Sequence, residues 1–188
     1  AEALATGGVD AVVASGAEAA GHRVSFLLPA EESVVGTFAL VPQVVDAVDV
    51  PVVAAGGIAD RRGVAAALAL GAAGVQVGTA FLATRQSAVT EAYRSAIANA
   101  AAQDTVLTRA MSGRLSRGLP NDATRTIEAA GRIAPFPAQN WLTGRFRTEA
   151  AARGRADLVS LWVGQAAALA RHTDAADVLA ELAHGLPH

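Results

Sequence analysis

The stretch Pro51-Val-Val-Ala-Ala-Gly-Gly-Ile-Ala-Asp60 is followed, one βα unit later, by Gly74-Val-Gln-Val-Gly-Thr79. Each half is a short β-branched run that ends in a glycine-bearing turn and continues into a helix-like stretch. Because glycine has no Cβ, the backbone N–H groups of both turns can approach one phosphate group. The candidate donors are Gly56, Gly57, Gly78 and Thr79. In (β/α)8 barrels such a phosphate site follows the seventh and eighth strands, beside a short extra helix.

Apolar runs predict buried parallel strands near Val9–Ala14, Pro51–Ala55 and Gly74–Val77. Between the first two, Thr37–Val48 carries apolar residues at helical spacing, and Asp60 is suited to cap the helix that precedes the third. This βαβ alternation predicts a parallel sheet with right-handed crossovers. The carboxyl ends of the three strands should therefore meet at one edge.

A long loop, Ser15–Gly36, separates the first strand from the first helix, and long loops in compact domains tend to be functional. It contains His22, whose imidazole titrates near neutral pH and can accept a proton from a carbon acid. His22 is therefore the candidate catalytic base. Its neighbours Glu18 and Arg23 can orient the imidazole, attract an anion or form a salt bridge between elements, and we favour the salt bridge.

Composition narrows the classes of function. The 188 residues are 52% hydrophobic and carry a formal net charge of −2, which argues against nucleic acid or a membrane surface as a partner. The chain has no cysteine, and no group of residues has metal-ligand spacing, so we expect no metal. No apolar run approaches the roughly 18 residues of a membrane span, and nothing resembles a signal peptide. We expect a cytoplasmic protein, and the sequence is compatible with a homo-oligomer.

The order of motifs closely resembles the nitronate monooxygenases, also called the 2-nitropropane dioxygenase family. Besides both glycine turns, the matching stretches are Ser15-Gly-Ala-Glu-Ala-Ala-Gly-His22, Val35-Gly-Thr-Phe-Ala-Leu-Val-Pro-Gln-Val-Val-Asp46, Arg109-Ala-Met-Ser-Gly-Arg-Leu-Ser-Arg-Gly-Leu-Pro-Asn121, Pro137-Ala-Gln-Asn140 and Ser160-Leu-Trp-Val-Gly-Gln165. The resemblance covers nearly the whole chain, in order. A weaker resemblance, through the histidine loop and both glycine turns, is to flavin-dependent enoyl-acyl-carrier-protein reductases.

The first resemblance implies FMN-dependent oxidation of alkyl nitronates, and of nitroalkanes, by O2 to a carbonyl compound and nitrite. It makes His22 the base that removes the α-proton of a neutral nitroalkane. It places the FMN phosphate at Gly56, Gly57, Gly78 and Thr79, and it places Ala19, Ala20 and Gly21 near the flavin ring or ribityl chain. The second resemblance implies a reductase that also needs NAD(P)H. A third hypothesis is a fragment that holds no flavin by itself.

The fold expected is α/β: the C-terminal part of a (β/α)8 TIM barrel with about three parallel strands, over residues 1–84. A complete barrel needs roughly 200 residues or more. Residues 85–188 should form a mainly helical cap packed on the barrel, with Trp141 and Trp162 in its core. Helices are expected near Ala88–Ala102, Ala123–Arg132, Gln139–Ala152, Leu158–Arg171 and Ala175–Gly185, with a short strand in Asp104–Met111 and a loop over Ser112–Asn121.

Overall fold

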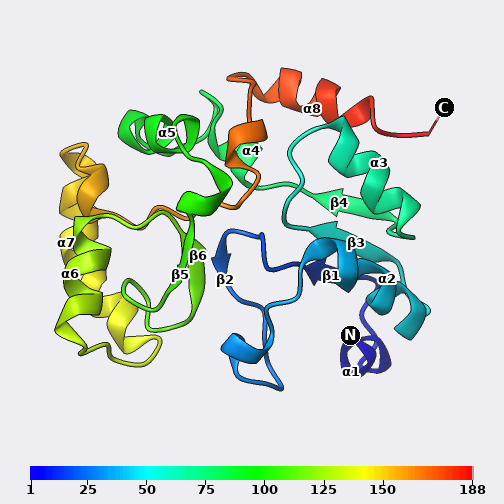
Figure 1. Ribbon diagram of the computed structural model, residues 1–188, viewed down its shortest axis with the longest axis horizontal. Coiled ribbons are helices and arrows are strands. Elements are labelled where there is room, and N and C mark those ends of the chain that lie inside the picture. Colours follow the sequence, from blue (N-terminus) through cyan, green and yellow to red (C-terminus); the bar gives the residue numbers. More distant parts are fainter. Residues whose placement is uncertain (188) are drawn as a thin grey trace.

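A three-stranded parallel sheet organises the first part of the chain (Figure 1). The computed structural model describes residues 1–187. Its parallel sheet contains, in spatial order, β1 (Val12–Ser15), β3 (Val52–Ala55) and β4 (Gly74–Gln76). The register places Ser15 beside Ala55, and Ala55 beside Gln76. The three strands thus end at one edge, which confirms the parallel order expected from the sequence.

The two crossover helices differ in how their first turns are capped. Helix α3 (Arg61–Ala69) starts at Asp60, whose carboxylate accepts hydrogen bonds from the amides of Arg62 and Gly63 at 3.0 and 3.3 Å. Helix α2 (Thr37–Ala47) follows Gly36, which offers no side-chain cap. Both helices bury apolar side chains against the sheet, with Val41 and Val64 almost completely covered.

A second, antiparallel sheet lies beside the first and was not expected. Its spatial order is β2 (Gly21–His22), β6 (Ser116–Gly118) and β5 (Val106–Thr108). Strand β5 confirms the strand predicted within 104–111, but β6 corrects the loop predicted over 112–121. Small and charged residues give β6 no apolar alternation. It is held instead by pairing on both sides and by buried polar contacts such as the Ser116 hydroxyl donating to the Thr108 carbonyl at 3.2 Å.

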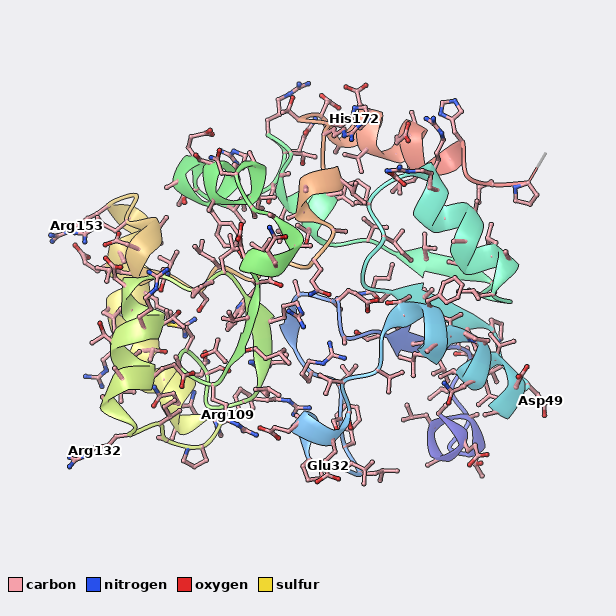
Figure 2. The ribbon with its side chains drawn as sticks, in the orientation of Figure 1. Glu32, Asp49, Arg109, Arg132, Arg153 and His172 are labelled. Atoms are coloured by element: carbon pink, nitrogen blue, oxygen red, sulfur yellow. The ribbon has the colours of Figure 1, made fainter. Side chains whose placement is uncertain are left out.

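The other helices surround these two sheets. They are α1 (Glu2–Thr6), α4 (Thr79–Leu82), α5 (Glu91–Ala98), α6 (Asp122–Ala130), α7 (Ala138–Ala152) and α8 (Ala175–Ala183), with 3-10 turns at Ala30–Glu32, Ala102–Asp104, Ala156–Leu158 and Ala167–Leu169. Helices α5, α6 and α7 gather on the side of the antiparallel sheet, whereas α8 returns to pack on α3 and α4 (Figure 1). In Figure 2 the side chains of Asp49, Arg132 and Arg153 point outward from the rim. Within residues 1–187, no helix combines the length and apolar character that a membrane crossing requires.

The predicted helix over 158–171 is wrong, because the backbone of residues 159–165 bonds to other elements and only a 3-10 turn, Ala167–Leu169, forms after it. The Leu161 carbonyl accepts a hydrogen bond from Leu119 N–H at 2.9 Å, and Gln165 N–H donates to the Glu18 carbonyl at 3.0 Å. The segment packs its apolar side chains against α5, where Ile97 and Val163 are fully buried. Residues 159–166 therefore form an irregular segment between the 3-10 turns Ala156–Leu158 and Ala167–Leu169. We call this segment the strap.

Candidate active site

A cavity of about 140 Å³ opens at the edge where the parallel strands end. Its walls come from the turns after β1, β3 and β4 and from the strap just described. The lining residues are Ser15, Glu18, Ala19, Ala20, Ala55, Gly56, Gly57, Ile58, Gln76, Gly78, Thr79, Gly164 and Ala166. Six of the seven residues predicted to bind a cofactor thus share one cavity. The seventh, Gly21, begins β2 one residue beyond the lining.

The polar character of this cavity comes mainly from the main chain. Within residues 1–187, the amides of Gly57, Gly78 and Thr79 donate no hydrogen bond to a protein acceptor. Gly57 has φ +75°, a left-handed conformation that turns the chain across the strand end. The Thr79 hydroxyl accepts a hydrogen bond from Gly164 N–H at 3.1 Å, which leaves its own proton available to a ligand. Free amides and a hydroxyl in a small cavity are a donor set for a phosphate group.

Position 164 requires glycine because atoms of neighbouring segments approach its backbone closely. A Cβ there would lie 2.9 Å from the Glu18 carbonyl oxygen and 3.3 Å from the Thr79 hydroxyl oxygen. The backbone of the strap can therefore close one side of the cavity only without a side chain. Sequence reasoning assigned no role to this residue, although it lies inside the Ser160–Gln165 motif.

Within residues 1–187, neither Glu18 nor Arg23 forms a salt bridge of the kind expected for each. The Glu18 carboxylate instead caps α2, where its two oxygens accept the Thr37 N–H at 3.0 and 2.9 Å. The Arg23 guanidinium, 2% exposed, donates to the carbonyls of Gly16 and Ser15 at 2.9 and 3.1 Å. Burial lowers the pKa of Arg23, the nearby Arg117 lowers it further, and Glu18 opposes both. These two residues therefore brace the loop at the end of β1.

His22 lies two residues beyond the cavity, on the short strand β2. Its Nε2 lies 2.8 Å from the Ser112 hydroxyl oxygen, and Ser112 is almost completely buried. That hydroxyl also lies 3.1 Å from the Arg114 carbonyl, to which it donates, and it accepts the Arg114 N–H at 3.3 Å. The imidazole ring itself is exposed. Ser112 was missed because its partner lies 90 positions away in the sequence.

Two aromatic rings approach the imidazole edge-on. The Phe136 ring centroid lies 5.4 Å from that of His22, and the Trp162 centroid lies 6.1 Å away. Trp162 is partly buried, whereas Trp141 is 72% exposed on α7, so its expected place in the core is wrong. The pKa of His22 is lowered by partial desolvation and, to a smaller extent, by the Arg114 charge. A lowered pKa favours the unprotonated imidazole, the form that can accept a proton.

Comparisons with known proteins agree on one family. The sequence matches the nitronate monooxygenase family model over residues 1–185. A probable nitronate monooxygenase of Staphylococcus aureus (strain Newman) is 50% identical over 165 residues, which cover 87% of this chain and 46% of that protein. The chain thus spans about half the length of the curated relatives it matches.

Two solved structures resemble the whole chain. A nitroalkane oxidase from Streptomyces ansochromogenes matches with a TM-score of 0.89 and 39% identity, over 98% of this chain and 55% of that one. FabK from Thermotoga maritima matches with a TM-score of 0.79 and 35% identity, over 97% of this chain and 57% of that one. The α/β arrangement seen here is therefore shared with both proteins.

Proposed function

Because the chain belongs to the nitronate monooxygenase family, we propose that the protein oxidises alkyl nitronates, and nitroalkanes, with FMN and O2 to a carbonyl compound and nitrite. One observation carries the proposal. A cavity with free main-chain donors ends at Ala20, and the exposed His22 follows two residues later on β2. The cavity would hold the cofactor, and the imidazole would face the substrate beside it.

The residues of the cavity fit the phosphate end of FMN. The amides of Gly57, Gly78 and Thr79 and the Thr79 hydroxyl would hold the phosphate oxygens, as at other phosphate sites that use main-chain N–H groups. Pockets that enclose a whole drug-sized ligand are larger, about 300–1,000 Å³. The remaining flavin would therefore extend past Ala19 and Ala20 toward Gly21, beyond the cavity of about 140 Å³. When bound, FMN supplies the electron transfer to O2.

His22 would act as the base on neutral nitroalkanes. With the Ser112 hydroxyl donating to the Arg114 carbonyl, the Nε2–H of His22 would donate to the Ser112 oxygen. This tautomer leaves the lone pair on Nδ1, which can accept the α-proton of the substrate. An ionised nitronate has already lost that proton and would not need the base. Phe136 and Trp162 would shield the imidazole from water on two sides.

A flavin-dependent enoyl-acyl-carrier-protein reductase is the second candidate. The similarity to FabK keeps it in consideration, and its lower TM-score and identity keep it second. We also propose that residues 1–188 do not turn over substrate by themselves, because the chain spans about half of its relatives and its cavity at the strand ends is large enough for a phosphate group but not for a whole flavin. The barrel and the helical cap expected from the sequence are part of the same proposal for the whole protein.

The test uses the purified full-length protein. A visible spectrum of bound oxidised flavin, together with O2 consumption and nitrite release on adding a primary alkyl nitronate, is the expected result. NADPH-dependent reduction of an enoyl thioester, without nitronate-dependent O2 consumption, would favour the second candidate. A folded, colourless protein that takes up no added FMN would contradict both.

A further inference from the structure

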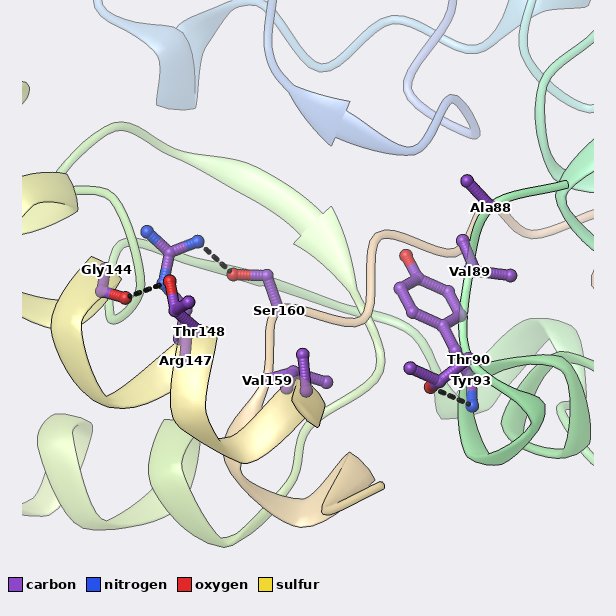
Figure 3. A pocket seen from close by; sticks show the side chains of 10 residues that line it. Ala88, Val89, Thr90, Tyr93, Gly144, Arg147, Thr148, Val159 and Ser160 are labelled. Atoms are coloured by element: carbon purple, nitrogen blue, oxygen red, sulfur yellow. Dashed lines mark hydrogen bonds between the residues drawn. The ribbon is translucent and has the colours of Figure 1, made fainter. Parts of the chain in front are cut away.

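A second pocket, of about 400 Å³, lies away from the cavity at the strand ends (Figure 3). It is bounded by α7, by the segment that leads into α5, and by the first residues of the strap. Its lining consists of Ala88, Val89, Thr90, Tyr93, Gly144, Arg147, Thr148, Ala151, Val159 and Ser160. The lining residues form two groups, apolar walls of alanine and valine, and hydroxyl groups near a single arginine.

Arg147 carries the only formal charge of this pocket's lining and lacks an ionic partner. It donates to the Ser160 hydroxyl at 2.9 Å and to the Asn140 side-chain carbonyl at 2.7 Å, and both acceptors are neutral. Within residues 1–187, no aspartate or glutamate forms a salt bridge with it. Its Nε is buried and makes no hydrogen bond. A guanidinium that is partly desolvated without a counter-ion favours the arrival of an anion.

Two of the four hydroxyl groups that line this pocket are free to donate, since the Thr148 hydroxyl donates to the Gly144 carbonyl at 2.9 Å and that of Tyr93 is also engaged. Ser160 accepts from Arg147, and Thr90 accepts the Tyr93 N–H at 3.3 Å, so the protons of both hydroxyls can turn into the pocket. The Tyr93 hydroxyl is committed to the Trp162 carbonyl at 3.1 Å, and burial raises the pKa of Tyr93 to about 12. Tyr93 therefore adds no negative charge near neutral pH. Among the lining residues there is no carboxylate to repel an anion.

We propose that this pocket binds a small organic monocarboxylate, with the carboxylate at Arg147 and Ser160 and a short aliphatic body against Val89 and Val159. One guanidinium matches one negative charge, whereas a phosphate monoester, with nearly two charges, would be left half neutralised. The apolar walls favour a ligand with a hydrocarbon part over an inorganic anion. This site is independent of the proposed oxidation chemistry, since it shares no lining residue with the cavity at the strand ends and contains none of the residues described beside His22.

Calorimetric titration of the full-length protein with sodium butyrate tests the site. We expect 1:1 binding with a Kd in roughly the millimolar range for so small a ligand. The substitution Arg147→Gln should weaken binding by at least about tenfold, because a charge-assisted hydrogen bond is lost. Arg145→Gln is the matched control, since Arg145 is an exposed arginine on the same helix that does not line the pocket. Equal affinities in the wild type and the Arg147→Gln variant would overturn the proposal.

Two further measurements distinguish a specific carboxylate site from an effect of misfolding and from a site that binds any anion. Ser160→Ala should weaken butyrate binding by roughly three- to tenfold while the circular dichroism spectrum stays unchanged. Inorganic phosphate should bind more weakly than butyrate. Tighter binding of phosphate would overturn the choice of carboxylate, and a folded wild-type protein that binds neither anion would overturn the site itself.

Discussion

The two parts of the candidate active site are built by different means. The cavity at the ends of the parallel strands presents main-chain amides from glycine turns, whereas the corner at His22 presents side chains from β2, from the turn before β6 and from the strap. The first part lies within continuous motifs and is sensitive to a Cβ added at Gly56 or Gly164, where neighbouring backbone atoms lie within 2.9 Å. The second depends on residues far apart in the sequence and is sensitive to the loss of a side chain. If this distinction is correct, variants of the two parts should affect different measurements.

The largest effect is expected for His22→Ala. Turnover of a neutral nitroalkane should fall by about 10²- to 10⁴-fold, the usual contribution of a positioned base. Turnover of the pre-ionised nitronate should fall much less, because its α-proton is already gone. Steady-state rates with matched neutral and ionised substrates measure both.

The FMN content of the His22→Ala protein should stay at the wild-type level, since the phosphate donors lie in the other part of the site. His172→Ala provides a control histidine that lies outside the site. Equal losses on both substrate forms at unchanged flavin content would rule out proton abstraction by His22.

Gly164→Val should have the opposite effect to His22→Ala, lowering the affinity for FMN rather than the rate of proton abstraction. A Cβ at this position meets the Glu18 carbonyl at 2.9 Å, so the strap must move away from Thr79 and one wall of the cavity shifts. We expect FMN affinity, measured by quenching of flavin fluorescence, to fall by about tenfold or more. Activity in saturating FMN should recover at least in part.

Gly144→Ala is the matched control for added bulk. Its Cβ would meet only the end of the Arg147 side chain at 3.7 Å, within α7. Normal FMN affinity in Gly164→Val, or a loss of activity that saturating FMN does not restore, would break the division of the site into two parts.

The difference between turns built from local motifs and contacts between distant residues also explains which features could be predicted from the sequence. The parallel sheet, α2, α3 and the Asp60 cap follow from local pattern, because apolar runs, helical spacing and a capping residue each act over a few positions. Six cofactor candidates share one cavity because parallel strands must end at one edge. The assignment of these residues to FMN stays a prediction.

The unpredicted features depend on tertiary contacts. Strand β6 contains Ser116 and Arg117, which carry no strand signal, and the Arg117 guanidinium is held by the Ala17 carbonyl, 100 positions away. The strap had an apolar, helix-like composition, but Gly164 and the bonds to Thr79 and Glu18 hold it extended. Exposure of Trp141 likewise follows from which face of α7 packs inward, a choice that composition alone does not specify.

Ser112→Ala tests the smaller contributions at the His22 corner. Without the hydroxyl, Nε2 loses its partner and the imidazole loses its preferred tautomer and orientation. Turnover of neutral nitroalkanes should fall by about two- to tenfold, the value of one neutral hydrogen bond. FMN content and nitronate turnover should be unchanged. Ser116→Ala, which also removes a buried hydroxyl of the antiparallel sheet, is the control, and an equal loss there would reduce Ser112 to a structural role.

The smallest effect is expected for Arg114→Gln, and it concerns pH rather than rate. The pKa of His22 lies below its ordinary value of 6.5, first because of desolvation and second because of the Arg114 charge. If the neutral imidazole is the base, as proposed, kcat/KM for neutral nitroalkanes should fall as the pH drops through this lowered pKa. Removing the charge at Arg114 should raise the pKa, so the acidic limb of the profile should move to higher pH. Desolvation remains in the variant, so the limb should stay below 6.5.

Added salt, which screens charges, should move the acidic limb of the wild-type profile in the same direction and leave that of the variant nearly unchanged. Arg125→Gln, at an exposed position on α6, is the control. A limb that stays in place or moves to lower pH would show that the base being titrated is not the imidazole beside Arg114.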